Sequence, residues 1–315
     1  MQNGPTRAAA ADGRGGAQWT AIQGPGALRR GGPRRWLSLA ILLFVGWLLA
    51  GFVGGHLVTR GRPASIPARV DLAGHAIEAV ATTTADGLTV RGWLVRARPD
   101  SRDCAVLATG IRGNRSSVLA GAEWYLARGW SALVVDLRAT GESDGGRVSM
   151  GWHEAADLRA WHALLRERGF TRLCAHGQSL GAAAIAYSDL PWDLMVLESC
   201  YVDIDEALRA RLPWVPFSEL LLWPLRRSAE WWSDTPAVLL RPGDALAKRR
   251  LPTLFLCGLA DTKVGIDGTQ RLAAACAAAD ERVVLIAGAG HQDLLAFDRA
   301  AVLGALASFV PVVGR

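Results

Sequence analysis

The stretch LCAHGQSLG at residues 173–181 constrains the fold of this chain more than any other part of the sequence. It contains the pattern G-x-S-x-G, with Ser179 between Gly177 and Gly181. An apolar run enters the pattern and an alanine-rich segment, residues 182–187, leaves it, which is the strand–turn–helix context of a nucleophile elbow. In so tight a turn, the residues two before and two after the serine must lack bulk, and glycine satisfies this condition. The sequence therefore predicts a serine hydroxyl exposed at the end of a strand.

The segments around this stretch alternate between strand-like and helix-like patterns. Two alternating runs on either side of Ala85-Asp86-Gly87 predict a β-hairpin. Further short apolar runs follow, separated by stretches of helical period. The expected strands are residues 76–83, 88–95, 105–108, 132–135, 173–175, 194–197, 253–257 and 282–286, with late helices at 270–279 and 293–309. Strands that alternate with helices predict the α/β class, with a mostly parallel sheet covered on both faces.

Residues 201–250 interrupt this alternation. The segment is rich in tryptophan and proline and has no clear strand. It lies where a lid is inserted between two strands of such a sheet. We therefore expect residues 201–250 to form a lid.

A serine becomes a nucleophile only when a base accepts its proton, and the base needs a carboxylate that orients it. In this architecture the chain order is serine, acid, histidine. Of the six histidines only His291 follows Ser179, and it lies in a loop directly after an apolar strand. Asp261 follows the strand expected at 253–257, so its loop leaves the same sheet edge. We expect Asp261 as the acid; Asp203 and Asp205, after the preceding strand, are the alternatives.

The oxyanion of an acyl-transfer intermediate needs two backbone N–H donors. The first is expected from Leu180, at the N-terminus of the helix that follows the serine. The second is expected from Ile111, in the loop after the strand at 105–108, where Gly110 lets the backbone turn inward. Arg112 and Arg115 in this loop suggest anion binding, but the spacing of a phosphate-binding loop is missing.

The N-terminal segment predicts a membrane anchor. Residues 36–53 carry no charge, and apolar character continues to Arg60 except at His56. At ~1.5 Å per residue this run is long enough to span a bilayer. It is longer than the roughly 7–15 residues of a signal-peptide core, and no A-x-A site follows it. We expect a disordered basic tail at 1–35, an uncleaved transmembrane helix at 36–58 and a linker at 59–75.

The arginines that flank this run predict its orientation. Six precede it and three follow it: Arg7, Arg14, Arg29, Arg30, Arg34 and Arg35, then Arg60, Arg62 and Arg69. By the positive-inside rule the N-terminus is expected in the cytoplasm and the domain at 76–315 on the outer side, periplasmic or extracellular. The spacing Gly51-x-x-x-Gly55 would allow close helix packing, although so glycine-rich a segment also produces it by chance.

Charge and cysteine content exclude several classes of function. The net charge is +6, but without the first 35 residues 29 basic and 28 acidic residues remain. A nearly neutral domain gives no electrostatic footprint for nucleic acid. The five cysteines form no C-x-x-C pair, which argues against a zinc site and a disulfide framework. The cysteine spacing thus predicts no metal site, and the sequence leaves the oligomeric state open.

The order of these motifs resembles that of the α/β-hydrolases. The resemblance covers about residues 76–312 and rests on the loop at 110–114, the turn at 136–143, the elbow at 177–181 and the Asp261/His291 pair. The chain is similar to the small-lidded serine hydrolases related to prolyl-oligopeptidase-like and serine-aminopeptidase-like domains. Thr109-Gly110 stands where many members have His-Gly.

The resemblance implies an eight-stranded, mostly parallel sheet with helices on both faces and a small helical lid. It implies Ser179 as nucleophile, Asp261 as acid and His291 as base, acting on esters, thioesters or amides without a metal or cofactor. We expect a serine hydrolase that cleaves an apolar acyl ester or thioester. A serine peptidase or aminopeptidase of the same fold, and a non-catalytic membrane scaffold, are the alternatives.

Overall fold

The computed structural model describes residues 33–64, 66–67, 70–72, 74–210, 214–215, 217–276, 278 and 280–313. The chain divides into two compact units, Met1–Val45 and Gly46–Arg315. Helix α1, Pro33–Thr59, begins in the first unit and ends in the second. The basic tail expected at residues 1–35 lies outside the described residues as far as residue 32.

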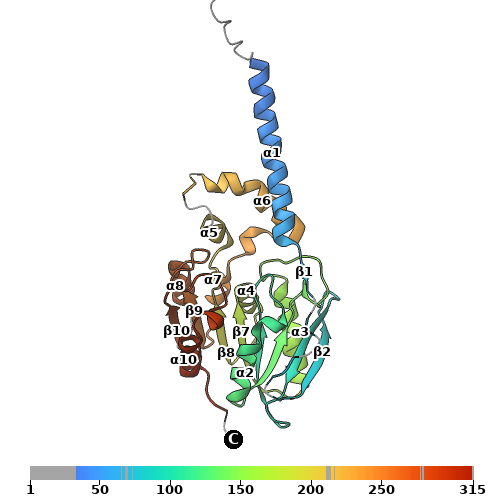
Figure 1. Ribbon diagram of the computed structural model, residues 1–315, viewed down its shortest axis with the longest axis vertical. Helices are drawn as coiled ribbons and strands as arrows, with labels where there is room; N and C mark the ends of the chain where they lie inside the picture. Colours follow the sequence, from blue (N-terminus) through green and yellow to red (C-terminus); the bar gives the residue numbers. More distant parts are fainter. Residues whose placement is uncertain are drawn as a thin grey trace, which may run out of the picture. The chain divides into compact units, whose positions relative to one another are not determined.

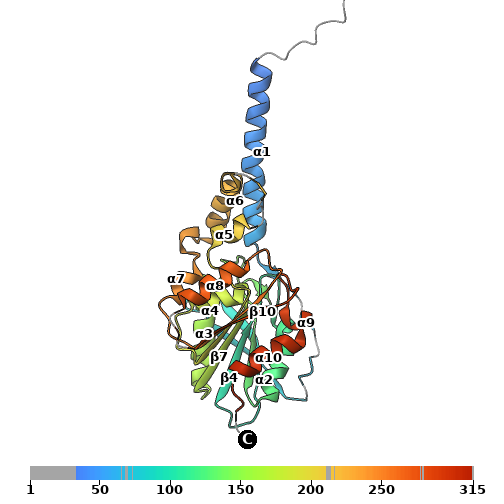
Figure 2. The ribbon, with the colours of Figure 1, turned by 90° about the vertical axis from the view of Figure 1, so that its left-hand side faces the viewer.

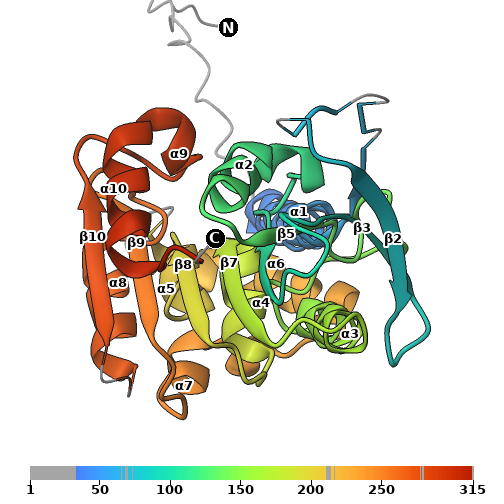
Figure 3. The ribbon, with the colours of Figure 1, turned by 90° about the horizontal axis from the view of Figure 1, so that it is seen from below.

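The second unit is built on an eight-stranded sheet of order β10-β9-β8-β7-β4-β5-β3-β2 (Figure 3). The strands β5, β4, β7, β8, β9 and β10 run parallel, whereas β3 is antiparallel to both β5 and β2. Their bounds are β2 Ile77–Thr83, β3 Thr89–Val95, β4 Asp103–Ala108, β5 Ser131–Val135, β7 Arg172–Gln178, β8 Leu194–Glu198, β9 Thr253–Gly258 and β10 Glu281–Ile286. The predicted α/β class, the hairpin and the mostly parallel sheet are confirmed.

Helices cover both faces of the sheet, as predicted (Figure 3). One face carries α2 (Leu119–Ala127), α9 (Leu294–Phe297) and α10 (Arg299–Phe309), and the other carries α3 (Glu154–Glu167), α4 (Leu180–Tyr187), α7 (Pro242–Leu246) and α8 (Ile266–Ala275). Two apolar clusters fill the spaces between sheet and helices. The central strands are buried on both sides, which is why β5 and β8 read as continuous apolar runs.

Two late helices differ from their predicted ranges. Residues 293–309 form two helices because Asp298, at φ −138° and ψ 84°, leaves the helical conformation and accepts a hydrogen bond from the Ala301 N–H as the cap of α10. The helix expected at 270–279 is α8, which ends when Cys276 turns extended. Residues 277 and 279 of the expected range lie outside the described part of the chain.

The inserted segment at 201–250 consists of helices joined by turns and loops where the structure describes it. It contains α5 (Ile204–Arg209), α6 (Ser218–Ser233), the 3₁₀ turn η2 (Ala237–Leu239) and α7. The region expected as a linker contains a short strand, β1 (Arg62–Pro63), parallel to β6 (Thr140–Gly141). This strand was not predicted, because two residues carry no periodic signal.

Among the described residues, α1 is the one helix long and apolar enough to cross a membrane. Its apolar residues 34–59 lie near the N-terminus, and a signal sequence has the same composition. In the second unit the last turns of α1 lie against α6, as Figures 1 and 2 both show.

Candidate active site

Ser179 lies in the tight turn between β7 and α4. Its backbone adopts φ 49° and ψ −103°, a positive φ that costs a non-glycine residue about 1–3 kcal/mol. The turn is held from two sides, because the Ser179 N–H donates to the Glu198 carbonyl (2.8 Å) and the Ser179 carbonyl accepts from the Ala183 N–H (3.0 Å). A strained serine at the carboxyl end of a central strand is the geometry of a nucleophile elbow.

The two glycines of the elbow lie in backbone contact with their neighbours. A Cβ added to Gly177 would lie 2.5 Å from the carbonyl carbon of Gly181. A Cβ added to Gly181 would lie 2.5 Å from the carbonyl oxygen of Ala108 in β4. Neither position has room for a side chain, because the atoms it would meet belong to the backbone.

Ser179, His291 and Asp261 form one chain of hydrogen bonds. Ser179 Oγ lies 3.1 Å from Nε2 of His291, and Nδ1 of His291 lies 2.8 Å from Oδ2 of Asp261. The three side chains come from loops that follow β7, β10 and β9, so they meet at the carboxyl edge of the parallel sheet. When His291 donates from Nδ1 to the carboxylate, its Nε2 is free to accept the serine proton.

Asp261 is held as an oriented carboxylate. Its side chain is buried, and Oδ1 accepts the N–H groups of Lys263 (2.9 Å) and Val264 (3.1 Å) while Oδ2 contacts His291. Burial raises the pKa of this carboxyl, but the hydrogen bonds from His291, Val264 and Lys263 outweigh it and leave the pKa below its usual value. The acid therefore stays ionised beside the imidazole at neutral pH.

The loop after β4 reaches the same space. Gly110 packs against Ser179: a Cβ added there would lie 3.4 Å from the Ser179 Cβ. Its carbonyl accepts the Gly113 N–H (3.0 Å), which closes a turn around Ile111, a half-exposed residue. Leu180 is the first residue of α4, so its N–H has no carbonyl partner within the helix. Both expected oxyanion donors thus belong to segments beside Ser179.

An ion-pair network anchors the loop from behind. The Arg115 guanidinium is buried and pairs with Asp136 and Glu142. Asp136 also accepts the N–H groups of Arg115 (2.6 Å) and Glu142 (3.0 Å). Arg115 is therefore a structural residue of this loop and is unavailable to an external anion.

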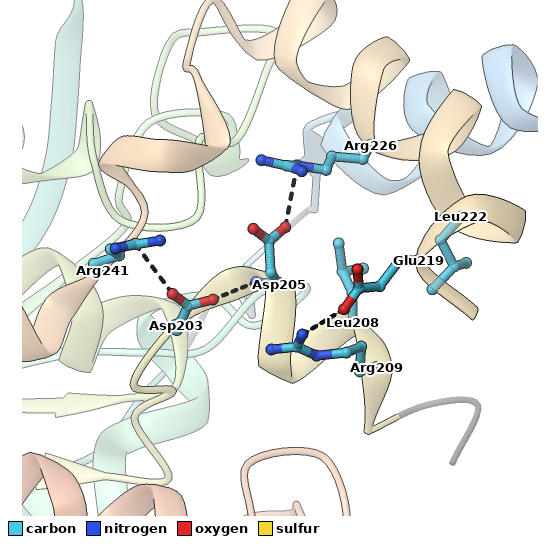
Figure 4. A pocket seen from close by; sticks show the side chains of 8 residues that line it. All are labelled: Asp203, Asp205, Leu208, Arg209, Glu219, Leu222, Arg226 and Arg241. Atoms are coloured by element: carbon cyan, nitrogen blue, oxygen red, sulfur yellow. Dashed lines mark hydrogen bonds and ion pairs between the residues drawn. The ribbon is translucent and has the colours of Figure 1, made fainter. Parts of the chain in front are cut away.

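The alternative acids are engaged elsewhere. Asp203 caps α5 and pairs with Arg241 (3.1 Å), and Asp205 pairs with Arg226 of α6 (3.1 Å), as Figure 4 shows. Neither carboxylate contacts His291. They line a cavity of about 220 Å³ between α5 and α6 (Figure 4), and the lining residues do not include Ser179, Asp261 or His291.

A second histidine–carboxylate pair lies beneath the elbow, and the sequence did not reveal it. Nε2 of His176 lies 2.7 Å from Oε1 of Glu198, and Nδ1 lies 3.3 Å from the Tyr125 hydroxyl. All three residues are buried. The one sequence signal for this pair is Glu198, a glutamate at the end of an otherwise apolar strand.

The described residues contain no group of three or more His, Cys, Asp or Glu side chains able to hold a metal ion. The five cysteines are buried and free. Burial raises the pKa of the Cys174 thiol to about 12, which leaves it protonated and unreactive at neutral pH.

The sheet, its elbow and its helical layers define an α/β-hydrolase fold. The chain belongs to the same family as the uncharacterized protein Rv2307c of Mycobacterium tuberculosis, to which it is 30% identical over 237 residues, 73% of this chain and 78% of the relative. It is also 27% identical to the uncharacterized protein YqkD of Bacillus subtilis over 200 residues, 60% of this chain and 65% of that protein. No protein-family model matches the chain.

Among solved structures, the esterase Pf2001 of Pyrococcus furiosus resembles the chain with a TM-score of 0.66 and 18% identity. The likeness covers 80% of this chain and 97% of the esterase. At this identity the comparison establishes the α/β-hydrolase fold, and the chemistry has to be argued from the site.

Proposed function

We propose that the chain is a membrane-anchored serine hydrolase that cleaves an acyl ester or thioester through an acyl-enzyme. The observation that carries this proposal is the hydrogen-bonded chain from Ser179 through His291 to Asp261, with the serine on a strained elbow. These are the parts that serine acyl transfer requires.

In the first half-reaction, His291 Nε2 takes the proton as Ser179 Oγ attacks the carbonyl carbon. The tetrahedral oxyanion accepts hydrogen bonds from the N–H groups of Leu180 and Ile111. The imidazolium then protonates the leaving alcohol or thiol as its bond to the acyl carbon breaks, and the acyl group stays on Ser179. Asp261 stabilises the imidazolium and fixes its tautomer, because its Oδ2 faces Nδ1.

The second half-reaction uses the same groups with water. His291 takes a proton from a water molecule, whose oxygen attacks the acyl carbon. Collapse of the second intermediate returns the proton to Ser179 and releases the acid. Both steps need only residues of this chain.

The substrate is proposed to be apolar. The inserted segment exposes large aromatic side chains, among them Trp214, Phe217 and Trp231. An aminopeptidase would need an unpaired acidic group to hold the substrate's ammonium. The acidic residues of the α5–α6 cavity, by contrast, are paired with arginines: Asp203 with Arg241, Asp205 with Arg226, and Glu219 with Arg209. This pairing favours an ester over a peptide.

The proposal keeps α1 as a retained anchor, with the domain on the outer side. Gly51 and Gly55 lie directly against α6, so removal of α1 as a signal sequence would uncover the helix that it contacts. Arg34 and Arg35 precede the apolar run, in keeping with a cytoplasmic N-terminus. A reporter enzyme fused to the C-terminus tests the side of the membrane.

The test of the chemistry is labelling by a fluorophosphonate in detergent micelles. The full chain and a Ser308→Ala variant, changed at an exposed serine of α10, should be labelled, and Ser179→Ala should not. Turnover of p-nitrophenyl esters of graded acyl length, beside an aminoacyl anilide, separates esterase from peptidase. Labelling that persists in Ser179→Ala would show that Ser179 is not the nucleophile. A wild type that is neither labelled nor active on any of these substrates would support the non-catalytic scaffold.

A further inference from the structure

Helix α6 of the inserted segment packs directly on the last turns of α1. A Cβ added to Gly51 would overlap Pro224 and lie 2.7 Å from the Leu225 nitrogen, and one added to Gly55 would overlap Ser228. The Ser228 hydroxyl donates to the Phe52 carbonyl (2.7 Å). The Gly51-x-x-x-Gly55 spacing thus serves a close helix–helix contact, in which small residues let the two backbones approach.

An apolar face of α6 continues the surface of α1. Leu220, Trp223 and Trp231 follow a helical spacing of three and eight residues, so they share one side of α6, and all three are exposed. The ring of Trp223 stacks on Trp47 at 6.4 Å, and Trp231 lies 5.8 Å from the ring of Phe52. We call this surface the α6 aromatic face.

The segment before α6 also exposes large aromatic side chains. Trp214 and Phe217 are among the most exposed large apolar side chains of the described chain, at 77% and 85%. Exposed tryptophans beside a long apolar helix are typical of the level where lipid headgroups meet the acyl chains.

The charged side of α6 points elsewhere. Arg226 pairs with Asp205 of α5, and Glu219 pairs with Arg209 of α5 (Figure 4). Arg227, four residues from both Trp223 and Trp231, pairs with Glu230 (3.0 Å) and places an exposed guanidinium on the aromatic side. The helix is amphipathic in its remaining residues, with Arg226 and Glu219 turned to α5 and the aromatic side chains to the outside. This is the distribution expected of a helix that lies in a membrane interface.

The position of the α1–α6 contact along α1 indicates which part of a bilayer would cover the α6 aromatic face. The contacts to α6 run from Trp47, whose indole N–H donates to the Leu221 carbonyl (2.9 Å), to Gly55. The uncharged run at 36–53 ends at Val53, so Trp47 lies about 9 Å before the outer end of this run, at ~1.5 Å per residue. A bilayer core is about 30 Å thick, so a helix docked on this part of a spanning α1 reaches the outer leaflet.

We propose that α6 is an interfacial membrane helix, whose aromatic face is covered by the lipids of the outer leaflet around α1. The inference rests on the proposed anchor role of α1. This placement holds the inserted segment at 201–250 in the headgroup region, where an acyl ester of a membrane lipid is within reach of the site.

A crevice beside the oxyanion loop agrees with this placement. It is lined by Leu57 and Val58 at the end of α1 and by Ile111 and Arg112 of the loop after β4. Its volume is about 10 Å³, room for no more than a water molecule. The end of α1 therefore borders the loop that is proposed to hold the oxyanion, so this loop lies on the side of the domain that faces the membrane.

The test is the depth of a fluorophore on the full chain in phosphatidylcholine/phosphatidylglycerol vesicles. An NBD group is attached at Leu220→Cys on the α6 aromatic face, at Leu43→Cys on α1 and at Ala307→Cys on the exposed side of α10. The labelled wild type is the blank, since its cysteines are buried. Quenching by aqueous iodide and by lipids with a doxyl group near the headgroup is then compared.

We expect position 220 to be protected from iodide and quenched by the shallow doxyl lipid, position 43 to be protected, and position 307 to be quenched by iodide. Iodide quenching at 220 equal to that at 307, with 43 protected, would overturn the inference and leave the anchor intact. Iodide quenching at both 43 and 220 would contradict the anchor role of α1 and, with it, the inference about α6. Fluorophosphonate labelling of Ser179 reports on the hydrolase chemistry in either case.

The glycine contact supplies a second measurement. A Gly51→Leu substitution should push α6 from α1 and raise iodide quenching at 220 at least twofold, while 43 stays protected. Gly46→Leu is the matched control, because a Cβ at Gly46 meets nothing within 4 Å. Equal quenching at 220 in the Gly51 and Gly46 variants would show that the contact does not hold α6 in place.

Discussion

The backbone N–H of Ser179 donates to the carbonyl oxygen of Glu198, and the carboxylate of the same glutamate binds His176. Residue 198 thus connects the elbow to the buried ring beneath it. His176 lies three residues before Ser179 on β7, and Glu198 ends the neighbouring strand β8. The pair joins β8 to β7, the strand that leads to Ser179.

This relationship predicts a graded response to substitution at Glu198. Glu198→Ala leaves a buried imidazole nitrogen without a partner, which costs about 1–3 kcal/mol of unfolding free energy. Glu198→Gln keeps an oxygen acceptor of similar shape and should lose less than half as much. Urea unfolding of the full chain in detergent measures both. Equal losses in the two variants would mean that packing, and not the hydrogen bond, is what the glutamate contributes.

Asp261→Asn should lower kcat with little effect on stability. The amide cannot hold the imidazole in the tautomer that accepts the serine proton, and in other serine hydrolases this change costs on the order of 10⁴ in kcat. Asp203→Asn is the matched control, because Asp203 caps α5 and pairs with Arg241 away from His291. Hydrolysis of a short p-nitrophenyl ester compares the two. A large kcat loss in the Asp203 variant alone would reassign the acid.

The sheet and its site edge were predictable because each strand of the core is a short apolar run bounded by loops. Since the carboxyl ends of parallel strands share one edge, Ser179, Asp261 and His291 could be placed near one another from their positions after β7, β9 and β10. The structure brings these side chains within hydrogen-bond distance. Their catalytic role stays a proposal until it is tested.

Three other features could not be read from the chain, and two of them depend on partners distant in sequence. The Gly51-x-x-x-Gly55 spacing has a structural role because α6, more than 160 residues later in the chain, packs against these glycines. The break at Asp298 is a helix cap inside a continuous helical sequence pattern. The pairing of Glu198 with His176 depends on the register of β8 against β7. Tertiary contact decided the glycine spacing and the Glu198–His176 pair, whereas the break at Asp298 depends on a hydrogen bond to Ala301, three residues later.

Gly181→Ala should destabilise the fold severely. The added methyl would lie 2.5 Å from the Ala108 carbonyl oxygen, so β4 and α4 must separate. We expect a loss of about 3 kcal/mol, the upper end of the range for overpacked cores. Gly304→Ala is the control, because its Cβ meets nothing within 4 Å in α10, and it should stabilise the helix by about 0.5–1 kcal/mol. Thermal unfolding of both variants checks the prediction, which a Gly181 variant of wild-type stability would contradict.

Asp86 in the β2–β3 turn predicts a pH-dependent stability. Its carboxylate makes two contacts with Arg138, at 2.7 and 3.0 Å, and the hydrogen bond from this guanidinium lowers the pKa of Asp86. The folded pKa lies below the unfolded one, so the contribution is present above the unfolded value of about 3.9 and is lost as the pH falls toward the folded value.

Asp86→Asn should therefore lower the unfolding free energy by about 0.5–1 kcal/mol at pH 7, the size of a partly exposed ion pair. The difference from wild type should be the same at pH 5 and shrink below pH 4. The matched control is Asp100→Asn, whose side chain is 89% exposed and lies 3.9 Å from Arg98; it should match wild type throughout. If the stability difference between Asp86→Asn and wild type grew as the pH fell from 5 to 3, the folded protein would hold the Asp86 proton more tightly than the unfolded chain. The pKa shift of Asp86 on folding would then have the opposite sign.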